Sequence, residues 1–306
     1  MILFDKKKLL LNSPNSNVAK YVVSGIGAKA MYSYDGVEWA ETPLPAEVTG
    51  TSVCYGKNMF IITCVEKQIF YSKDGKTWAS ATLPKISGSA SYISSCYGNG
   101  VFVAITSSGP QSLYSTDGIE WNITNLPDSF YWRGICYADD RFVAIGNSTS
   151  VATAAYSYDG ITWQMSNANI SGLTTGSLPI CYGNGVFVAK NSGNGKPFYS
   201  TDLSSWTQSS TYVNSSFLCY GNNVFIGARG GSSSYYSYDG VVWNKGEKPS
   251  YGYGIYPGIC CYDGERFWLI DDDGPIVFSY DGVNWEDGAV LPSEFQAKAI
   301  GCYKEE

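Results

Sequence analysis

The sequence predicts an all-β fold, a seven-bladed β-propeller built from four-stranded antiparallel blades, and two repeated motifs predict it. The octet Tyr-Ser-x-Asp-Gly-x-x-Trp, with one substitution in each of two copies, occurs seven times, and its serines lie at positions 33, 72, 115, 157, 200, 237 and 279. A second motif, Cys-Tyr followed by a turn and an apolar run, recurs in phase at Cys54, Cys96, Cys136, Cys181, Cys219, Cys261 and Cys302. From position 33 to 279 the six steps average 41 residues. Repeats of about 40 residues without helical periodicity are typical of propeller blades.

Four strands, A to D in chain order, are expected in each repeat. In the segment 181–189, Asn184-Gly185 separates two β-prone runs, which is the strongest short-range signal for a hairpin and predicts strands A and B. A short run ending in Tyr-Ser then gives strand C, and the Asp-Gly turn leads into strand D, which carries the Trp. A solenoid is the alternative arrangement, but stacked repeats need atypical caps at both ends.

The two ends of the repeat array are expected to complete each other. The run Tyr21–Gly25 resembles a B strand that no Cys-Tyr strand precedes, whereas the segment around Cys302 is an A strand that no B strand follows. Pairing these two segments removes two open sheet edges. The sequence therefore predicts a ring closed by the C-terminal A strand, with residues 1–18 as an N-terminal extension and 19–306 as the propeller.

Composition excludes several classes of function. The chain has 306 residues, a net charge of −7 and no histidine, which argues against nucleic-acid binding, histidine metal sites and histidine-dependent catalysis. No secretory signal and no apolar stretch approaching a membrane span are visible, so we expect no membrane insertion. No cofactor and no metal are expected, and whether Asp271, Asp272 and Asp273 bind a cation stays open because they lack the ligand spacing of a calcium loop. The seven repeat cysteines are expected to be reduced and buried, since equivalent positions in neighbouring blades should lie too far apart for disulfides. Cys64 and Cys260 lie outside the repeat pattern, and at most one of the adjacent Cys260 and Cys261 is expected in the core.

The octet resembles the Asp-box of sialidase-type propellers, one residue shorter because Asp is followed directly by Gly. This resemblance implies a structural hairpin turn away from any active site. Local chemistry agrees, because Asp accepts hydrogen bonds from turn amides and Gly supplies a positive φ. Leu203 replaces this Gly in the fifth copy, so that turn is expected to be strained or remodelled. The structural turn residues are Asp35, Asp74, Asp117, Asp159, Asp202, Asp239 and Asp281.

A sialidase reaction is not expected, because the chain has four arginines and two of them, Arg141 and Arg266, lie in predicted A–B turns. Arg133 and Arg229 cannot supply the arginine triad that sialidases use. The sequence therefore predicts a non-enzymatic protein, with a glycan-active hydrolase on the same scaffold as the alternative.

Binding is expected on the face formed by the B–C and D–A loops, because these loops differ between repeats while the turns of the other face do not. Aromatic side chains beside Ser and Asn suit recognition of carbohydrate or protein. The candidate ligand-binding residues are Tyr92, Tyr131, Trp132, Arg133, Tyr212, Tyr251, Tyr253 and Tyr256.

The tandem motifs are also similar to those of propeller proteins of bacteriophages and prophages, which are labelled as tail or fibre components. This resemblance implies a virion component that is assembled in the host cytoplasm. Its expected partners are a cell-surface carbohydrate or protein and other virion proteins.

Overall fold

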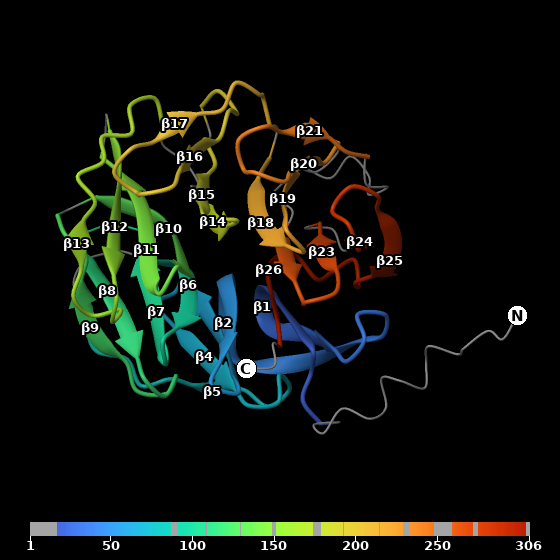
Figure 1. Ribbon diagram of the computed structural model, residues 1–306. Helices are drawn as coiled ribbons and strands as arrows, with labels where there is room; N and C mark the ends of the chain where they lie inside the picture. The colour runs from blue at the N-terminus through green and yellow to red at the C-terminus, as the bar shows by residue number, and fades with distance from the viewer. Residues whose placement is uncertain are drawn as a thin grey trace, which may run out of the picture.

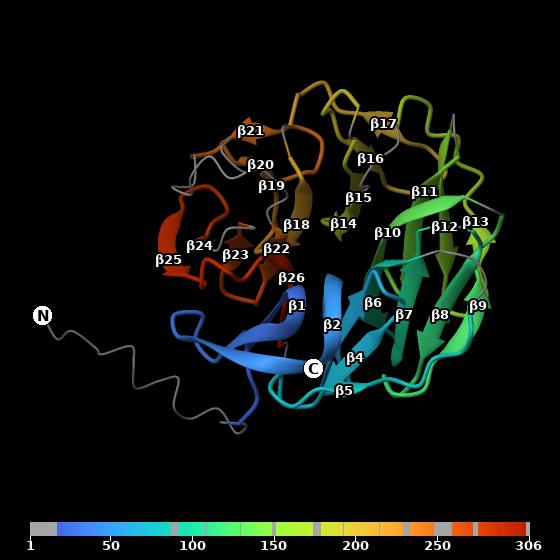
Figure 2. The ribbon, with the colours of Figure 1, turned by 180° about the vertical axis from the view of Figure 1, so that it is seen from behind.

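The computed structural model describes residues 17–86, 91–107, 109–128, 130–148, 151–173, 179–191, 193–213, 215–228, 233–247, 259–271 and 275–303. Their strands are all antiparallel and form a ring of sheets around a central axis (Figure 1). Figure 2 shows the same ring from behind. Among the described residues no helix is long and apolar enough to cross a membrane.

One sheet has six strands in the order β26-β1-β2-β3-β4-β5. These are β1 (Tyr21–Ser33), β2 (Trp39–Gly56), β3 (Met59–Cys64), β4 (Ile69–Ser72), β5 (Ala79–Ser80) and β26 (Ala297–Cys302).

The other five sheets have four strands each, in chain order from the axis outward. They are β6 (Tyr92–Gly98), β7 (Val101–Thr106), β8 (Gln111–Ser115) and β9 (Asn122–Asn125); β10 (Tyr131–Ala138), β11 (Arg141–Asn147), β12 (Ala152–Ser157) and β13 (Gln164–Met165); β14 (Ile180–Gly183), β15 (Val186–Ala189), β16 (Phe198–Ser200) and β17 (Thr207–Gln208); β18 (Phe217–Gly221), β19 (Val224–Ala228), β20 (Tyr235–Ser237) and β21 (Asn244–Lys245); and β22 (Ile259–Tyr262), β23 (Phe267–Ile270), β24 (Pro275–Ser279) and β25 (Glu286–Val290).

The prediction of seven blades was wrong, because the strands form six sheets. The six-stranded sheet carries two copies of the octet, at Ser33 and Ser72. The physical reason is the strand β2, which runs without a break over 18 residues from the Trp of the first octet to the second repeat's inner strand. Its middle pairs with β1 through Ile26↔Thr49, so a backbone ladder takes the place of the loop expected between the two repeats.

The closing strand lies where the sequence predicts it. β26 pairs with the first part of β1, from Tyr21↔Cys302 to Gly25↔Ala297. It also packs against β2 and against β22 of the last four-stranded sheet. The seam between β22 and β26 therefore joins the two ends of the repeat array.

The core lies between the sheets, and in the four-stranded sheets the second strand is the most buried. Phe102, Phe142 and Phe187 on three of these strands have no exposed surface, and each buried Phe stabilises the fold by about 2–3 kcal/mol. Nearer the axis, a Tyr ring of one sheet lies on a Gly of the sheet before it. A Cβ atom at Gly98 would lie 1.9 Å from Cγ of Tyr137, so glycine allows this close approach.

Candidate functional site

The carboxylates of the octet turns are occupied by the turns themselves. In the fourth copy, Oδ1 of Asp159 accepts hydrogen bonds from the amides of Ile161 (2.8 Å) and Thr162 (2.7 Å) and from Oγ of Ser157 (2.9 Å). Burial opposes ionisation, but these bonds outweigh it and lower the pKa of Asp159. The carboxylate therefore holds the hairpin turn closed.

Apart from the second turn, whose Gly75 faces Ala19 and Val22 beside its own sheet, these turns also dock on the preceding sheet of the ring. A Cβ at Gly160 would lie 2.8 Å from Cγ2 of Val103, and Nδ2 of Asn99 donates to the carbonyl of Tyr158 at 3.1 Å. Asn184 donates in the same way to the carbonyl of Tyr238 at 2.8 Å. The sequence predicts Asn184 only as part of a hairpin turn. It does not predict the hydrogen bond from the Asn184 side chain to the next sheet, which joins neighbouring sheets.

The strain predicted for the fifth turn is confirmed. Leu203 takes the backbone conformation of the glycine that it replaces, with φ at 67°. Its side chain is 1% exposed and packs with Val143 and Phe187 between two sheets. Burial of the leucine therefore offsets the cost of the left-handed backbone.

The candidate binding residues divide into exposed and buried ones. Tyr131 and Tyr212 are 44% and 54% exposed, and the guanidinium of Arg133 lies 5.3 Å from the centroid of the Tyr131 ring. Tyr92 and Trp132 are each 1% exposed, because their rings pack into the hydrophobic clusters between the sheets. Their side chains belong to the core and offer no surface to a ligand.

The three remaining candidates cannot be placed in this way. Tyr251, Tyr253 and Tyr256 lie outside the described residues, as do Arg229, Asp272 and Asp273. Asp271 is described and is 3% exposed. Within the described part of the chain, no three His, Cys, Asp or Glu side chains form a group that could hold a metal ion.

The opposite face also carries exposed tyrosines, at the third position of four octets. Each packs edge-on against the first aromatic ring of its own octet, as Tyr158 does on Tyr156 with the ring planes at 79°. The four exposed tyrosines are Tyr34, Tyr158, Tyr238 and Tyr280, between 42% and 62% exposed. They were not predicted as site residues, although their recurrence is visible in the octet.

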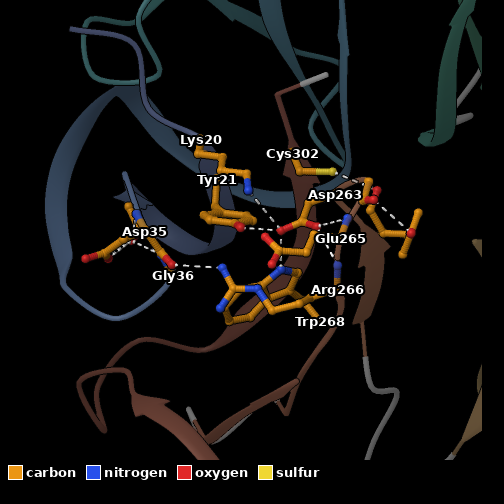
Figure 3. Close-up of polar contacts among 12 residues, drawn as sticks. Lys20, Tyr21, Asp35, Gly36, Asp263, Glu265, Arg266, Trp268 and Cys302 are labelled. Carbon is orange, nitrogen blue, oxygen red and sulfur yellow. Dashed lines mark hydrogen bonds and ion pairs between the residues drawn. The ribbon is translucent and has the colours of Figure 1, made fainter. Parts of the chain in front are cut away.

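A polar cluster beside the β22–β26 seam centres on Asp263, whose side chain is 0% exposed (Figure 3). Its Oδ2 accepts from the hydroxyl of Tyr21 and from Nε1 of Trp268 (2.9 Å), and Nζ of Lys20 lies 3.2 Å away. Its Oδ1 accepts from the amides of Glu265 (2.8 Å) and Arg266 (2.7 Å). Asp263 thus binds residues that precede it by more than 240 positions in the chain.

Electrostatics at this cluster favour the charged carboxylate. Burial raises the pKa of Asp263, but the hydrogen bonds from Tyr21, Trp268 and the two amides outweigh it and hold the pKa at about 2. Burial and the Asp263 charge raise the pKa of Tyr21, which therefore keeps its proton and donates. The cluster is a structural clamp, because every acceptor site of the carboxylate is occupied by the protein itself.

Arg266 extends the clamp to the first octet. Its guanidinium lies 4.5 Å from the centroid of the Trp268 ring and donates to the carbonyl of Asp35 at 3.4 Å. A Cβ at Gly36 would lie 2.2 Å from the same Trp268 ring. The sequence placed Arg266 in a surface turn, and its contact with the first octet could be found only in three dimensions.

These features define the protein as an all-β β-propeller, and the comparisons with solved structures agree. Virginiamycin B lyase from Staphylococcus aureus matches with 14% identity over 89% of this chain and 95% of that one, at a TM-score of 0.65. YCF48 from Cyanidioschyzon merolae matches with 17% identity over 84% and 89%, at 0.59, and YCF48 bound to D1 peptide with 16% over 90% and 95%, also at 0.59. No family model matches the chain, and no curated protein matches it. At these identities the likeness shows the fold alone.

Proposed function

We propose that this chain is a non-catalytic binding protein that captures a protein or a cell-surface glycan on its B–C and D–A loop face. The observation that carries the proposal is the exposure of Tyr131 and Tyr212 on that face. Both rings are supported by neighbouring groups. The guanidinium of Arg133 lies over the Tyr131 ring. The Tyr212 ring packs on the backbone at Gly195, where an added Cβ atom would lie 2.5 Å from the ring. Rigid, exposed aromatic rings lose little entropy on binding.

The chemistry of the described residues supports binding rather than catalysis. Both oxygens of Asp263 and Oδ1 of each octet carboxylate accept hydrogen bonds from the protein's own groups, which gives these carboxylates a structural role. The chain has no histidine, whereas a virginiamycin B lyase in which one histidine is replaced by alanine is described as catalytically inactive. Among the structural neighbours, YCF48 bound to D1 peptide is an example of a propeller that holds a protein segment.

The finer proposal is that the protein is a virion component of a phage or prophage, a tail, fibre or decoration protein that binds its target from the particle. The tandem octet and Cys-Tyr motifs support it through their similarity to phage propeller proteins. A glycan-active hydrolase is the second candidate, since the octet resembles the Asp-box of sialidases.

A glycan array and a panel of chromogenic glycosides separate these two candidates. We expect retention on a subset of glycans, or on host cells through a protein, without release of chromophore. Turnover of any glycoside would support the hydrolase instead.

The face itself is tested with two matched substitutions. Tyr212→Ala on the loop face should weaken binding by about 2 kcal/mol if the ring is a hot spot. Tyr158→Ala on the opposite face is the control, because that ring is 56% exposed compared with 54% for Tyr212. Loss of binding in the Tyr158 variant and retention in the Tyr212 variant would mean that the other face binds the target.

A further inference from the structure

One exposed ring of the octet turns already holds a cation of the chain itself. Tyr34 is at the third position of the first octet, and Lys76 is at the sixth position of the second. Nζ of Lys76 donates to the Tyr34 hydroxyl at 2.8 Å and lies 5.5 Å from the centroid of the Tyr34 ring. An ammonium group at an octet tyrosine is therefore a contact that this fold makes.

The repeat builds the same surroundings at Tyr238, without the lysine. Tyr238 is at the third position of the sixth octet, and Val283 is at the sixth position of the seventh. The carbonyl of Lys76 accepts a hydrogen bond from Thr42, which follows the first octet. In the same way the carbonyl of Val283 accepts one from the amide of Glu247, which follows the sixth octet, at 3.2 Å. Val283 therefore faces the sixth octet as Lys76 faces the first, but it brings no charge.

The octet tyrosines that lack a cation are the more exposed ones. Tyr34 and Tyr280 are 43% and 42% exposed, and each has a cation of the chain near its ring, which for Tyr280 is Arg266 at 6.0 Å from the centroid. Tyr158 and Tyr238 are 56% and 62% exposed, and within the described part of the chain no Lys or Arg lies over either ring. Both rings are held edge-on by the first ring of their own octet, so they are fixed in place before a partner binds.

The octets around these two rings are acidic. The seven octets together contain nine carboxylates and two lysines, and both lysines are in the second octet. Octets four to seven contain four aspartates and no Lys or Arg. Burial opposes ionisation, but hydrogen bonds from turn amides outweigh it and lower the pKa of Asp159, Asp239 and Asp281. These carboxylates are therefore charged at neutral pH and attract a cation.

The A–B turns share this face, because their asparagines donate hydrogen bonds to carbonyls of the octet turns. We call the surface made of the octet turns and the A–B turns the turn face. The two arginines of the A–B turns are already bound by the chain. Arg141 pairs with Asp139 at 2.8 Å, and Arg266 donates to the carbonyl of Asp35 at 3.4 Å. The turn face therefore keeps an excess of negative charge.

We propose that the turn face is a docking surface for a lysine-rich segment of a partner protein. One ammonium group binds at Tyr238 as Lys76 binds at Tyr34, over the ring and hydrogen-bonded to the hydroxyl, and a second binds at Tyr158. A single exposed contact of this kind changes affinity only about two- to fivefold. A segment that carries several lysines makes the later contacts intramolecular and so binds more tightly than a single cation. This surface is separate from the loop face, so the two faces can be occupied at once.

The probe is a fluorescein-labelled oligolysine peptide, and its binding to the full chain is measured by fluorescence anisotropy. The same peptide with acetylated lysines is the control. We expect the charged peptide to bind and the acetylated peptide not to bind, with binding weakened by salt because exposed charges are screened. Failure of the charged peptide to bind, or equal binding of the acetylated one, would overturn the proposal.

Substitutions at the rings separate the tyrosines from the overall charge. Tyr238→Leu keeps an apolar side chain but removes the ring, so it should weaken binding about two- to fivefold, and the double variant with Tyr158→Leu about four- to twenty-five-fold. Tyr238→Phe should bind more tightly than Tyr238→Leu. Tyr212→Leu on the loop face should bind as the parent does. Parent-like binding by the double variant, or loss of binding in Tyr212→Leu, would show that the turn-face rings do not hold the peptide.

A lysine supplied by the chain provides a second test. Val283→Lys places in the seventh octet the lysine that the second octet has, so it should occupy the Tyr238 ring and weaken peptide binding at least as much as Tyr238→Leu. Val241→Lys adds the same charge next to an octet whose third residue is Thr201, and it should weaken binding less. Thermal unfolding shows whether each variant is folded. Equal weakening by the two lysine variants would mean that only net charge matters, and the proposed site at Tyr238 would be refuted.

Discussion

Replacing Asp263 by Asn tests the clamp that joins the ends of the repeat array. Asn has nearly the same shape, but it removes the charge and replaces one acceptor oxygen by a donor. In the parent protein, Oδ2 of Asp263 accepts hydrogen bonds from the Tyr21 hydroxyl and the Trp268 indole and forms an ion pair with the Lys20 ammonium. An amide nitrogen in the place of Oδ2 would therefore face hydrogen-bond donors only. We expect the free energy of unfolding to fall.

The size of the loss follows from the pKa of the carboxyl. Lowering the pKa from 3.8 to about 2 corresponds to about 2 kcal/mol, since each pKa unit is worth about 1.4 kcal/mol. The donors left without an acceptor raise the expected loss to about 2–4 kcal/mol. For a chain of 306 residues this is a fall in Tm of about 3–6 °C.

Dependence on pH separates the charge from the shape of the side chain. A carboxyl whose pKa is lowered on folding stabilises the protein above its unfolded pKa, and this stability is lost as the pH falls from 3.8 towards about 2. In urea unfolding, the difference between the parent and Asp263→Asn should therefore be full at pH 6 and should shrink below pH 4.

The control is Asp140→Asn, because Asp140 is an exposed residue in the equivalent turn of another sheet and should change stability by less than about 0.5 kcal/mol. A loss as small as this in Asp263→Asn, or a difference between parent and variant that does not change with pH, would refute the clamp.

Three further perturbations test other parts of the fold. Deleting residues 299–306 removes most of β26 and leaves the edge of β1 unpaired, so the Tm should fall well beyond that of a surface truncation, and a fall within about 2 °C would show that closure contributes little. Leu203→Gly relieves a positive φ worth about 1–2 kcal/mol but leaves a cavity worth about 2–5 kcal/mol, so urea unfolding should show a net loss of about 1–3 kcal/mol, and a gain in stability would mean that strain dominates. Trp132→Ala should cost about 3–5 kcal/mol of stability because the ring is 1% exposed, and unchanged stability with lost binding would return Trp132 to the binding surface.

The sequence by itself determined the features that depend on neighbouring residues. The Asp-Gly turns, the Asn-Gly hairpins and the alternating strands are local, so the octet spacing was enough to predict a propeller of antiparallel sheets. The strand that begins at Tyr21 could also be matched with the strand that ends at Cys302. A repeat array leaves one strand without its repeat partner at each end, and these two strands complete each other. The strain at Leu203 was predictable for the same reason, since a turn that needs a positive φ constrains one residue.

Only the tertiary structure decided how repeats join one another. The continuous strand β2 merges two repeats into one sheet, and no local motif distinguishes a paired connection from a loop. Successive side chains of a strand point to opposite faces, so Trp132 was indistinguishable from its exposed neighbour Tyr131 in β10 until the register was known. The Asp263 clamp brings together residues distant in sequence, and such contacts depend on ring geometry rather than on any pattern along the chain.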